Sequence, residues 1–178
     1  PADVVVTPGC KQAVLYGLMA ILDAGDEVLL LSPAWPSYDG MVKLTGAVPI
    51  HVPVKRENYH PNFENLEAAV TSKTKAIMLN SPNNPTGAVY TPEEVEKIVA
   101  FAIKHDLWIL DDMIYATLVW SDHPYTSPCT IPGGAERTIT IGGWSKGWAM
   151  TGWRLGWITG PKVVMDGVKK INVSAATH

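Results

Sequence analysis

The amino-acid sequence predicts an α/β domain built on a mostly parallel sheet. Seven short apolar segments, each rich in Val, Ile or Leu and bounded by turn residues, have the character of strands buried on both faces. They span residues 3–7, 27–32, 48–52, 75–80, 107–111, 138–142 and 155–159. Amphipathic stretches separate several of them, and alternating strands and helices of this kind form sheets whose strands run mostly in parallel.

Four amphipathic stretches are expected to be helices. The clearest, residues 91–105, begins with Thr91 as the N-cap, Pro92 in the first turn and Glu94, which completes a capping box. Its apolar residues recur at helical spacing and make one buried stripe. The other helices are expected over residues 10–22, 36–44 and, starting after Asn62, the stretch NFENLEAAV.

Composition limits the classes of function. The chain has 178 residues, of which 47% are hydrophobic, which suits one domain with a sizeable core. Fourteen basic and seventeen acidic residues give a net charge of −3, which argues against a nucleic-acid partner but leaves room for one local anion site. No apolar run approaches the roughly 18 to 20 residues that a membrane span requires. Cys10 and Cys129 lie far apart without metal-like spacing, so we expect no metal site and reduced thiols in a cytoplasmic protein, with a disulfide as the less favoured alternative.

Ligands of parallel sheets bind beyond the carboxyl ends of the strands, so the residues that follow each strand are the candidates for function. After the first strand, in TPGCKQA, Gly9 permits a tight turn and the next backbone N–H groups open a helix, which can bind an anion. Any strand–turn–helix unit shares this feature. After the second strand, in SPAWPSY, Trp35 can either cover a flat ring or fill the core.

Two further strand ends carry polar residues. NSPNNPTG follows the fourth strand and predicts a tight turn with a cis bond between Asn84 and Pro85, with either a structural or a ligand-binding role. LDDMIYATLVW follows the fifth. There Asp112 ends an apolar strand, where a carboxylate requires a cation or hydrogen-bond donors, and Tyr115 can reach the same place. A helix-capping aspartate is the alternative, although the downstream LVW is strand-like.

The stretch GGWSKGWAMTGWRLGW, residues 142–157, places one lysine among apolar residues and one arginine eight positions later. A lysine in an apolar, partly desolvated pocket favours the amine form, which suits Lys146 to a Schiff base with an aldehyde. Arg154 offers a planar fork for a phosphate, together with the helix that begins after Gly9. This stretch therefore predicts a ligand that carries both an aldehyde and a phosphate.

The remaining strand-end residues complete the outline of that ligand. Asp112 can pair with a pyridinium nitrogen and make the ring an electron sink. Trp35 can stack on the ring, while Asn84 and Tyr115 can hydrogen-bond its phenolic oxygen. These features together predict pyridoxal 5′-phosphate.

The sequence resembles the fold-type I pyridoxal-phosphate enzymes, and closely the aspartate-aminotransferase-like class I/II aminotransferases. TPGCKQA, GDEVLLLSPAWPSY, TKAIMLNSPNNPTGAVY, LWILDDMIYATLVW and SKGWAMTGWRLGWITGP are similar to that family's blocks and occur in the same order. The combination of NSPNNPTG with SKGWAMTGWR is highly specific. The resemblance implies a three-layer α/β/α large domain whose seven-stranded sheet is mostly parallel and has one antiparallel strand.

The resemblance also implies residue roles. Lys146 is the Schiff-base lysine, Asp112 the partner of the pyridine nitrogen, and Tyr115 the third catalytic residue. The remaining cofactor-binding residues are Asn84 for the ring hydroxyl, Trp35 for stacking, and Ser145, Arg154, Gly9, Cys10 and Lys11 for the phosphate. Two positions depart from the family pattern: Gly143 stands where many relatives carry a hydroxyl residue, and Cys10 where many carry serine. One phosphate contact and one side-chain donor are therefore expected to differ.

The implied function is transfer of an amino group between an L-amino acid and a 2-oxo acid, with the freed Lys146 amine as general base. A carbon–sulfur β-lyase or an aminocyclopropane-carboxylate-synthase-like enzyme is the alternative, because the same cofactor residues serve those reactions. An aminotransferase-like sensor domain of a transcription regulator is a third interpretation, although nothing basic or helix-turn-helix-like occurs in the chain.

The family also has an N-terminal segment, a C-terminal small domain that binds the substrate carboxylate, and a homodimer interface at the active site. Residues 1–178 are thus expected to be the cofactor-binding large domain, poorly active by itself.

Overall fold

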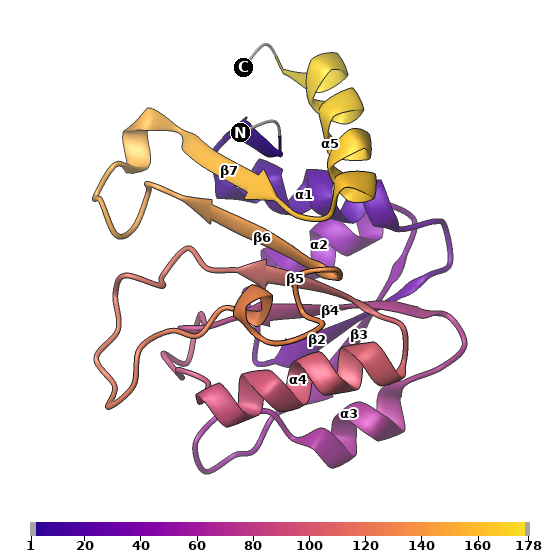
Figure 1. The fold of residues 1–178 in the computed structure, drawn as a ribbon, viewed down its shortest axis with the longest axis vertical. Helices are drawn as coiled ribbons and strands as arrows, with labels where there is room; N and C mark the ends of the chain where they lie inside the picture. The colour runs from indigo at the N-terminus through magenta and orange to yellow at the C-terminus, as the bar shows by residue number, and fades with distance from the viewer. Residues whose placement is uncertain (1–2, 177–178) are drawn as a thin grey trace.

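The computed structural model describes residues 3–176, in which seven strands form one sheet with the order β1-β7-β6-β5-β4-β2-β3 (Figure 1). The strands are β1 (Val4–Pro8), β2 (Glu27–Ser32), β3 (Val48–Pro53), β4 (Thr74–Asn80), β5 (Trp108–Asp112), β6 (Thr138–Gly143) and β7 (Leu155–Thr159). Strand β7 runs antiparallel to both of its neighbours, β1 and β6, and the other pairs are parallel. The predicted mixed sheet with one antiparallel strand is confirmed.

Helices cover both faces of this sheet and make three layers (Figure 1). The helices are α1 (Cys10–Ile21), α2 (Ser37–Leu44), α3 (Phe63–Ala69), α4 (Pro92–Lys104) and α5 (Lys162–Ala175). Helices α1, α2 and α5 pack on one face, and α3 and α4 on the other. Helix α4 has the predicted capping box, formed by Thr91 and Glu94.

Helix α5 was not predicted from the sequence. Its buried residues Val164, Met165 and Val168 have helical spacing, but no side chain caps its first turn. The helix is instead held by packing against α1, where Gly167 lies close enough to Ala20 that an added Cβ would be 3.4 Å from the Ala20 Cβ. Tertiary contact therefore defines this helix more than a local stop or start signal.

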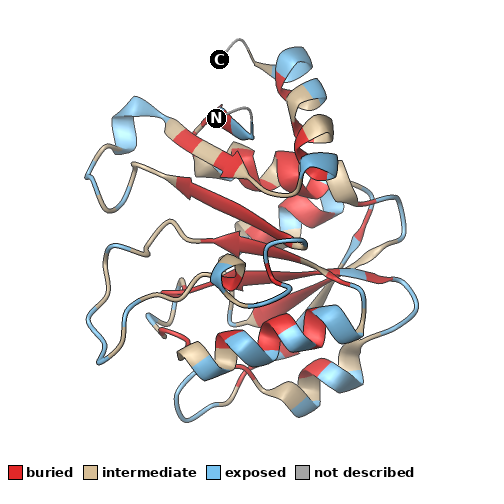
Figure 2. Cartoon of the chain, in the orientation of Figure 1, coloured by how far each residue is buried: buried red, intermediate tan, exposed pale blue. Residues whose placement is uncertain are grey.

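Burial follows the layers (Figure 2). The central strands β2, β4, β5 and β6 are almost continuously buried, as expected for strands covered by helices on both faces. The edge strand β1 alternates between exposed and buried residues instead. Leu118–Trp120, which is strand-like in sequence, lies outside the strands, and the Trp120 side chain is 88% exposed. Within residues 3–176, no helix combines the length and hydrophobicity needed to cross a membrane.

Candidate active site

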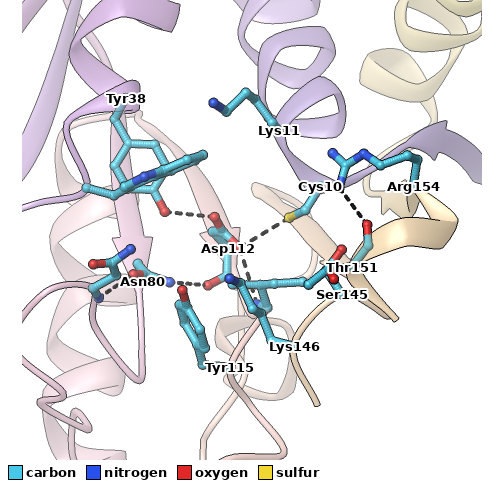
Figure 3. Close-up of a pocket in the computed structure, with 13 residues that line it drawn as sticks. Cys10, Lys11, Tyr38, Asn80, Asp112, Tyr115, Ser145, Lys146, Thr151 and Arg154 are labelled. Atoms are coloured by element: carbon cyan, nitrogen blue, oxygen red, sulfur yellow. Dashed lines mark hydrogen bonds between the residues drawn. The ribbon is translucent and has the colours of Figure 1, made fainter. Parts of the chain in front are cut away.

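A cavity of about 220 Å³ at the carboxyl ends of β4, β5 and β6 brings most of the predicted residues together (Figure 3). The predicted residues that line it are Cys10, Lys11, Trp35, Asn84, Asp112, Tyr115, Ser145, Lys146 and Arg154. Four further residues also line it, and no pattern in the sequence indicated a role for them: Tyr38, Asn80, Ile114 and Thr151. Residues far apart in the chain therefore share one site, as the rule for parallel sheets predicts.

Gly9 does not line the cavity but shapes its edge. Its φ of +87° is one that L side chains rarely adopt, and a Cβ at this position would lie 2.5 Å from Nη2 of Arg154. Gly156 lies against the backbone of Gly9, because a Cβ at Gly156 would be 2.4 Å from the Gly9 carbonyl carbon. These two glycines let β7 run beside the turn before α1.

Arg154 and the first turn of α1 form a cationic end of the cavity. The Arg154 guanidinium lies against Gly9, and its Nη1 donates to the Thr151 carbonyl at 3.1 Å. Helix α1 has neither a side-chain cap nor an acidic residue in its first turn. Its leading N–H groups are thus open to an anion, and Arg154 adds charge at the same place.

Asp112 lies at the centre of the cavity and is 3% exposed. Its Oδ2 accepts a hydrogen bond from the Tyr38 hydroxyl at 2.7 Å, and its Oδ1 accepts from the Cys10 thiol at 3.4 Å and from the Ile114 backbone N–H at 3.2 Å. Burial raises the pKa of Asp112, and these donors oppose the increase. The bond from Ile114 stabilises the turn after β5, but no helix begins there in the described chain, so the alternative of a helix-capping aspartate is wrong.

Asn80, the last residue of β4, joins two strand ends. Its Nδ2 donates to the Asp112 carbonyl at 2.8 Å, and its Oδ1 accepts from the Asn84 backbone N–H at 2.8 Å. The Asn84–Pro85 peptide bond is cis, as predicted. Burial and the nearby Asp112 carboxyl raise the pKa of Tyr115, while a hydrogen bond with the Asn84 side chain opposes that increase. Asn84 and Tyr115 therefore adjoin at one side of the cavity.

Lys146 follows β6 and places Nζ 6.0 Å from the centroid of the Tyr115 ring. The residue is exposed, which corrects the expectation of a lysine desolvated by neighbouring tryptophans. Trp148 and Trp153 are 64% and 69% exposed, so these two rings do not form a buried apolar pocket around Lys146. The amine thus borders the cavity and solvent together.

Trp35 packs as well as lining the cavity. Its ring meets the Tyr38 ring edge-on at 5.3 Å, and Lys11 Nζ lies 5.0 Å from its centroid. Trp35 therefore contacts the core, as the structural interpretation expects, and its position beside the cavity leaves stacking on a ring as a prediction.

The two departures from the family pattern have local explanations. A Cβ at Gly143 would lie 2.9 Å from the Leu155 carbonyl oxygen and 3.2 Å from the Ile114 side chain, so this backbone favours glycine. Burial and Asp112 raise the pKa of the Cys10 thiol, which keeps the thiol protonated as a donor. Cys10 therefore donates to Asp112. The described residues contain no cluster of three or more His, Cys, Asp or Glu side chains that could hold a metal ion.

Comparison with known proteins identifies relatives along nearly the whole chain. The family model described as aminotransferase class I and II matches residues 1–176. The aspartate aminotransferase of Musicola paradisiaca is 42% identical over 95% of this chain and 42% of its own length. The probable aspartate/prephenate aminotransferase of Thermus aquaticus is 42% identical over 99% of this chain and 46% of its own length.

Solved structures agree with the sequence relatives. The aspartate aminotransferase from Thermus thermophilus with maleate has a TM-score of 0.94 and 41% identity, over 98% of this chain and 45% of that one. The aromatic aminotransferase from Pyrococcus horikoshii OT3 has a TM-score of 0.94 and 40% identity, over 97% and 46%. The chain spans less than half the length of these relatives. Both its sequence and its fold show that the chain belongs to the class I and II aminotransferase family.

Proposed function

We propose that residues 1–178 form the cofactor-binding part of a pyridoxal 5′-phosphate-dependent aminotransferase. One observation carries the proposal: a single cavity is lined by the amine of Lys146, the buried carboxyl of Asp112 and the guanidinium of Arg154. These three groups are complementary to the aldehyde, the ring nitrogen and the phosphate of the cofactor. The enzyme would move an amino group between an L-amino acid and a 2-oxo acid.

The residues present fit this cofactor on structural grounds. Among residues 3–176, no cationic side chain lies within ion-pair distance of Asp112, so a protonated ring nitrogen would supply the charge that a buried carboxylate lacks. The first turn of α1 and Arg154 offer several N–H donors to a phosphate. Trp35 lines the cavity, and its indole is a side chain of the kind that can cover a planar ring.

Bound in this cavity, pyridoxal phosphate supplies an aldehyde for the amino group and a ring that accepts the electron pair released at the substrate Cα. Lys146, as a free amine, would be the base that moves the proton between the substrate Cα and C4′ of the cofactor. Asp112 would hold a proton on the ring nitrogen, and Asn84 with Tyr115 would hold the ring hydroxyl oxygen. Arg154 and the Cys10–Lys11 amides fix the phosphate, and Ser145 borders the same end, so the reacting atoms stay oriented.

We further propose that this chain corresponds to the large domain of a cytoplasmic homodimer and that the arginine for the substrate carboxylate lies outside residues 1–178. The length of the relatives, of which the chain covers 42% to 46% in the cases above, supports the domain part of this proposal, and the homodimer and the cytoplasm are what the family resemblance implies. Reading the gene on both sides of this segment tests the domain proposal. The names of the relatives make aspartate and aromatic amino acids the amino donors to assay first. The assays would use 2-oxoglutarate as the amino acceptor. Pyruvate and ammonia from cystathionine would indicate a β-lyase instead.

Borohydride should label one lysine. The protein loaded with pyridoxal phosphate is expected to absorb in the visible range and to lose that band on reduction, because the cofactor is then fixed to an amine. Peptide mass spectrometry should locate the added mass on Lys146. A label on Lys11, the other lysine that lines the cavity, would contradict the assignment. The Lys146→Ala protein is the matched control and should carry no label.

Arg154→Ala should weaken cofactor binding. Losing a charge-assisted phosphate contact costs about 1.5 to 3 kcal/mol, which is roughly tenfold or more in affinity. Equilibrium titration with pyridoxal phosphate measures the change. Arg56→Ala, which removes an exposed arginine outside the cavity, is the matched control. Equal affinity in the Arg154→Ala and control proteins would place the phosphate site elsewhere.

A further inference from the structure

We infer that Tyr38 is a positioning residue, whose buried hydroxyl holds Asp112 as an oriented carboxylate for the ring nitrogen of the cofactor. This inference rests on the proposed function. It adds a residue of α2 that acts through Asp112 rather than on the cofactor. The neighbouring Cys10 thiol is the weaker second side-chain donor in the same arrangement.

Burial and contacts at both the backbone and the ring fix the orientation of the Tyr38 side chain. Its side chain is 2% exposed and its hydroxyl lies 2.7 Å from Asp112 Oδ2 (Figure 3). Its backbone N–H donates to the Trp35 carbonyl at 3.0 Å, and its ring packs edge-on against the Trp35 ring. The contacts with Trp35 therefore fix the backbone and the ring of Tyr38, and its hydroxyl is held against Oδ2 of Asp112.

The donors on Asp112 leave room for one further partner. A carboxylate offers about four acceptor sites. Oδ1 accepts from Cys10 and from the Ile114 N–H, while Oδ2 accepts from Tyr38. About one site then remains, on Oδ2, and Asp112 borders the cavity. A protonated ring nitrogen has one N–H to donate, so it matches the site that remains.

Tyr38 also biases the charge state of Asp112. Burial raises the pKa of Asp112, and of the opposing contributions the hydrogen bond from Tyr38 is the largest. Burial and Asp112 raise the pKa of Tyr38 well above its ordinary value, so the phenol remains a donor. Removing the hydroxyl raises the pKa of Asp112 further. On acidification, Asp112 of such a variant therefore becomes protonated at a higher pH than in the wild type.

Other titratable groups surround Asp112 and must be held constant. They come from α1, from the segments after β5 and β6, and from the residue before β7. These groups are Cys10, Lys11, Tyr115, Lys146 and Arg154. The adjacent carboxyl of Asp111 interacts with Asp112 through its charge as well. A variant that changes Tyr38 alone leaves all of them in place.

The test measures pyridoxal phosphate affinity as a function of pH in the wild type, in Tyr38→Phe and in a control. The affinity of each protein should fall on the acid side as Asp112 becomes protonated. For Tyr38→Phe this fall should occur about one to two pH units higher, the size expected for a hydrogen bond to a charged group. Tyr16→Phe is the matched control, because Tyr16 is also 2% exposed but its hydroxyl contacts Gln12 rather than Asp112.

A second pair of variants tests the other donor. Cys10→Ala should move the acid-side fall in the same direction by a smaller amount, since a thiol is a weak donor. Cys10→Ser provides a stronger donor than the thiol and should bring the fall back to the wild-type pH or to a lower one. Ring-nitrogen ¹⁵N chemical shifts of labelled cofactor give an independent readout. In Tyr38→Phe the signal should move toward the unprotonated pyridine.

The outcomes separate this inference from the proposed function. A wild-type protein that does not bind pyridoxal phosphate rejects the proposed function. A wild type that binds, with Tyr38→Phe falling at the same pH as Tyr16→Phe, rejects only the role of Tyr38. If Tyr38→Phe does not fold, 3-fluorotyrosine at position 38 decides the question. Its more acidic phenol is a stronger donor and should lower the pH at which the cofactor affinity falls. An unchanged or higher pH for this fall would overturn the inference.

Discussion

Lys146→Ala is expected to lower the turnover number of the protein loaded with pyridoxal phosphate by about 10²- to 10⁴-fold, the range for a lost general base. Lys146 Nζ borders the cavity beside the Tyr115 ring. The other lysine of the cavity, Lys11, places its ammonium over Trp35 and therefore does not stand in for it. Because residues 1–178 are proposed to be one domain of a longer enzyme, steady-state assays of that whole enzyme with aspartate and an aromatic donor measure the effect.

The control for this experiment is Lys43→Ala. Lys43 is an exposed lysine on α2 that pairs with Asp39 and lies outside the cavity. Its loss should leave turnover close to that of the wild type. Turnover in Lys146→Ala within a few fold of the Lys43→Ala value would remove Lys146 from the proton transfer. The assignment of the other cavity residues would then need a different base.

The sheet could be predicted because its strands repeat one simple physical requirement. Strands covered by helices on both faces need near-continuous apolar residues, and β2, β4 and β6 have them. Helix α4 was equally accessible, since Thr91 and Glu94 cap it from within its own sequence. Helix α5 has no such side-chain cap and depends on contact with α1, which local pattern does not report.

Many of the residues that line the cavity could also be predicted, because they follow the predicted strands. Residues that follow buried strands are brought to one edge of the sheet, and Asn84, Asp112 and Lys146 all line the cavity there. Their supporting partners were missed. Tyr38 and Asp112 are 74 residues apart in sequence, and Asn80 and Asp112 are 32 apart. Such pairs form only when helices and neighbouring strands pack, so no spacing in the sequence indicates them.

The exposure of Lys146 shows a second limit. Four tryptophans lie within residues 142–157, and their frequency indicated an apolar pocket. In the structure the chain turns tightly after β6, with positive φ at Ala149 and Arg154, and Trp148 and Trp153 are left largely exposed. Composition near a residue thus predicted its surroundings poorly, because the direction of each ring depends on turn geometry.

The second large effect is expected at Asp112. Asp112→Ala should lower the turnover number by about 10²- to 10³-fold, the usual loss when one preorganised electrostatic group is removed, and should also weaken cofactor binding, but by a smaller factor. The carboxylate stabilises the charge on the ring nitrogen most when electrons flow into the ring, whereas Arg154 and the α1 N–H groups hold the phosphate in either variant. Asp112→Asn keeps the shape without the charge and should be nearly as slow.

Asp111→Asn provides the matched control, because it removes the carboxylate next in sequence. Successive side chains of a strand point to opposite faces, so Asp111 lies on the face packed by α4, away from the cavity. The Tyr125 hydroxyl donates to it, and burial raises its pKa to about 7 against that hydrogen bond. An asparagine there can still accept from Tyr125, and turnover should stay near wild type. Equal losses in Asp111→Asn and Asp112→Asn would mean that burial of a charge in β5, and not the contact with the ring nitrogen, carries the effect.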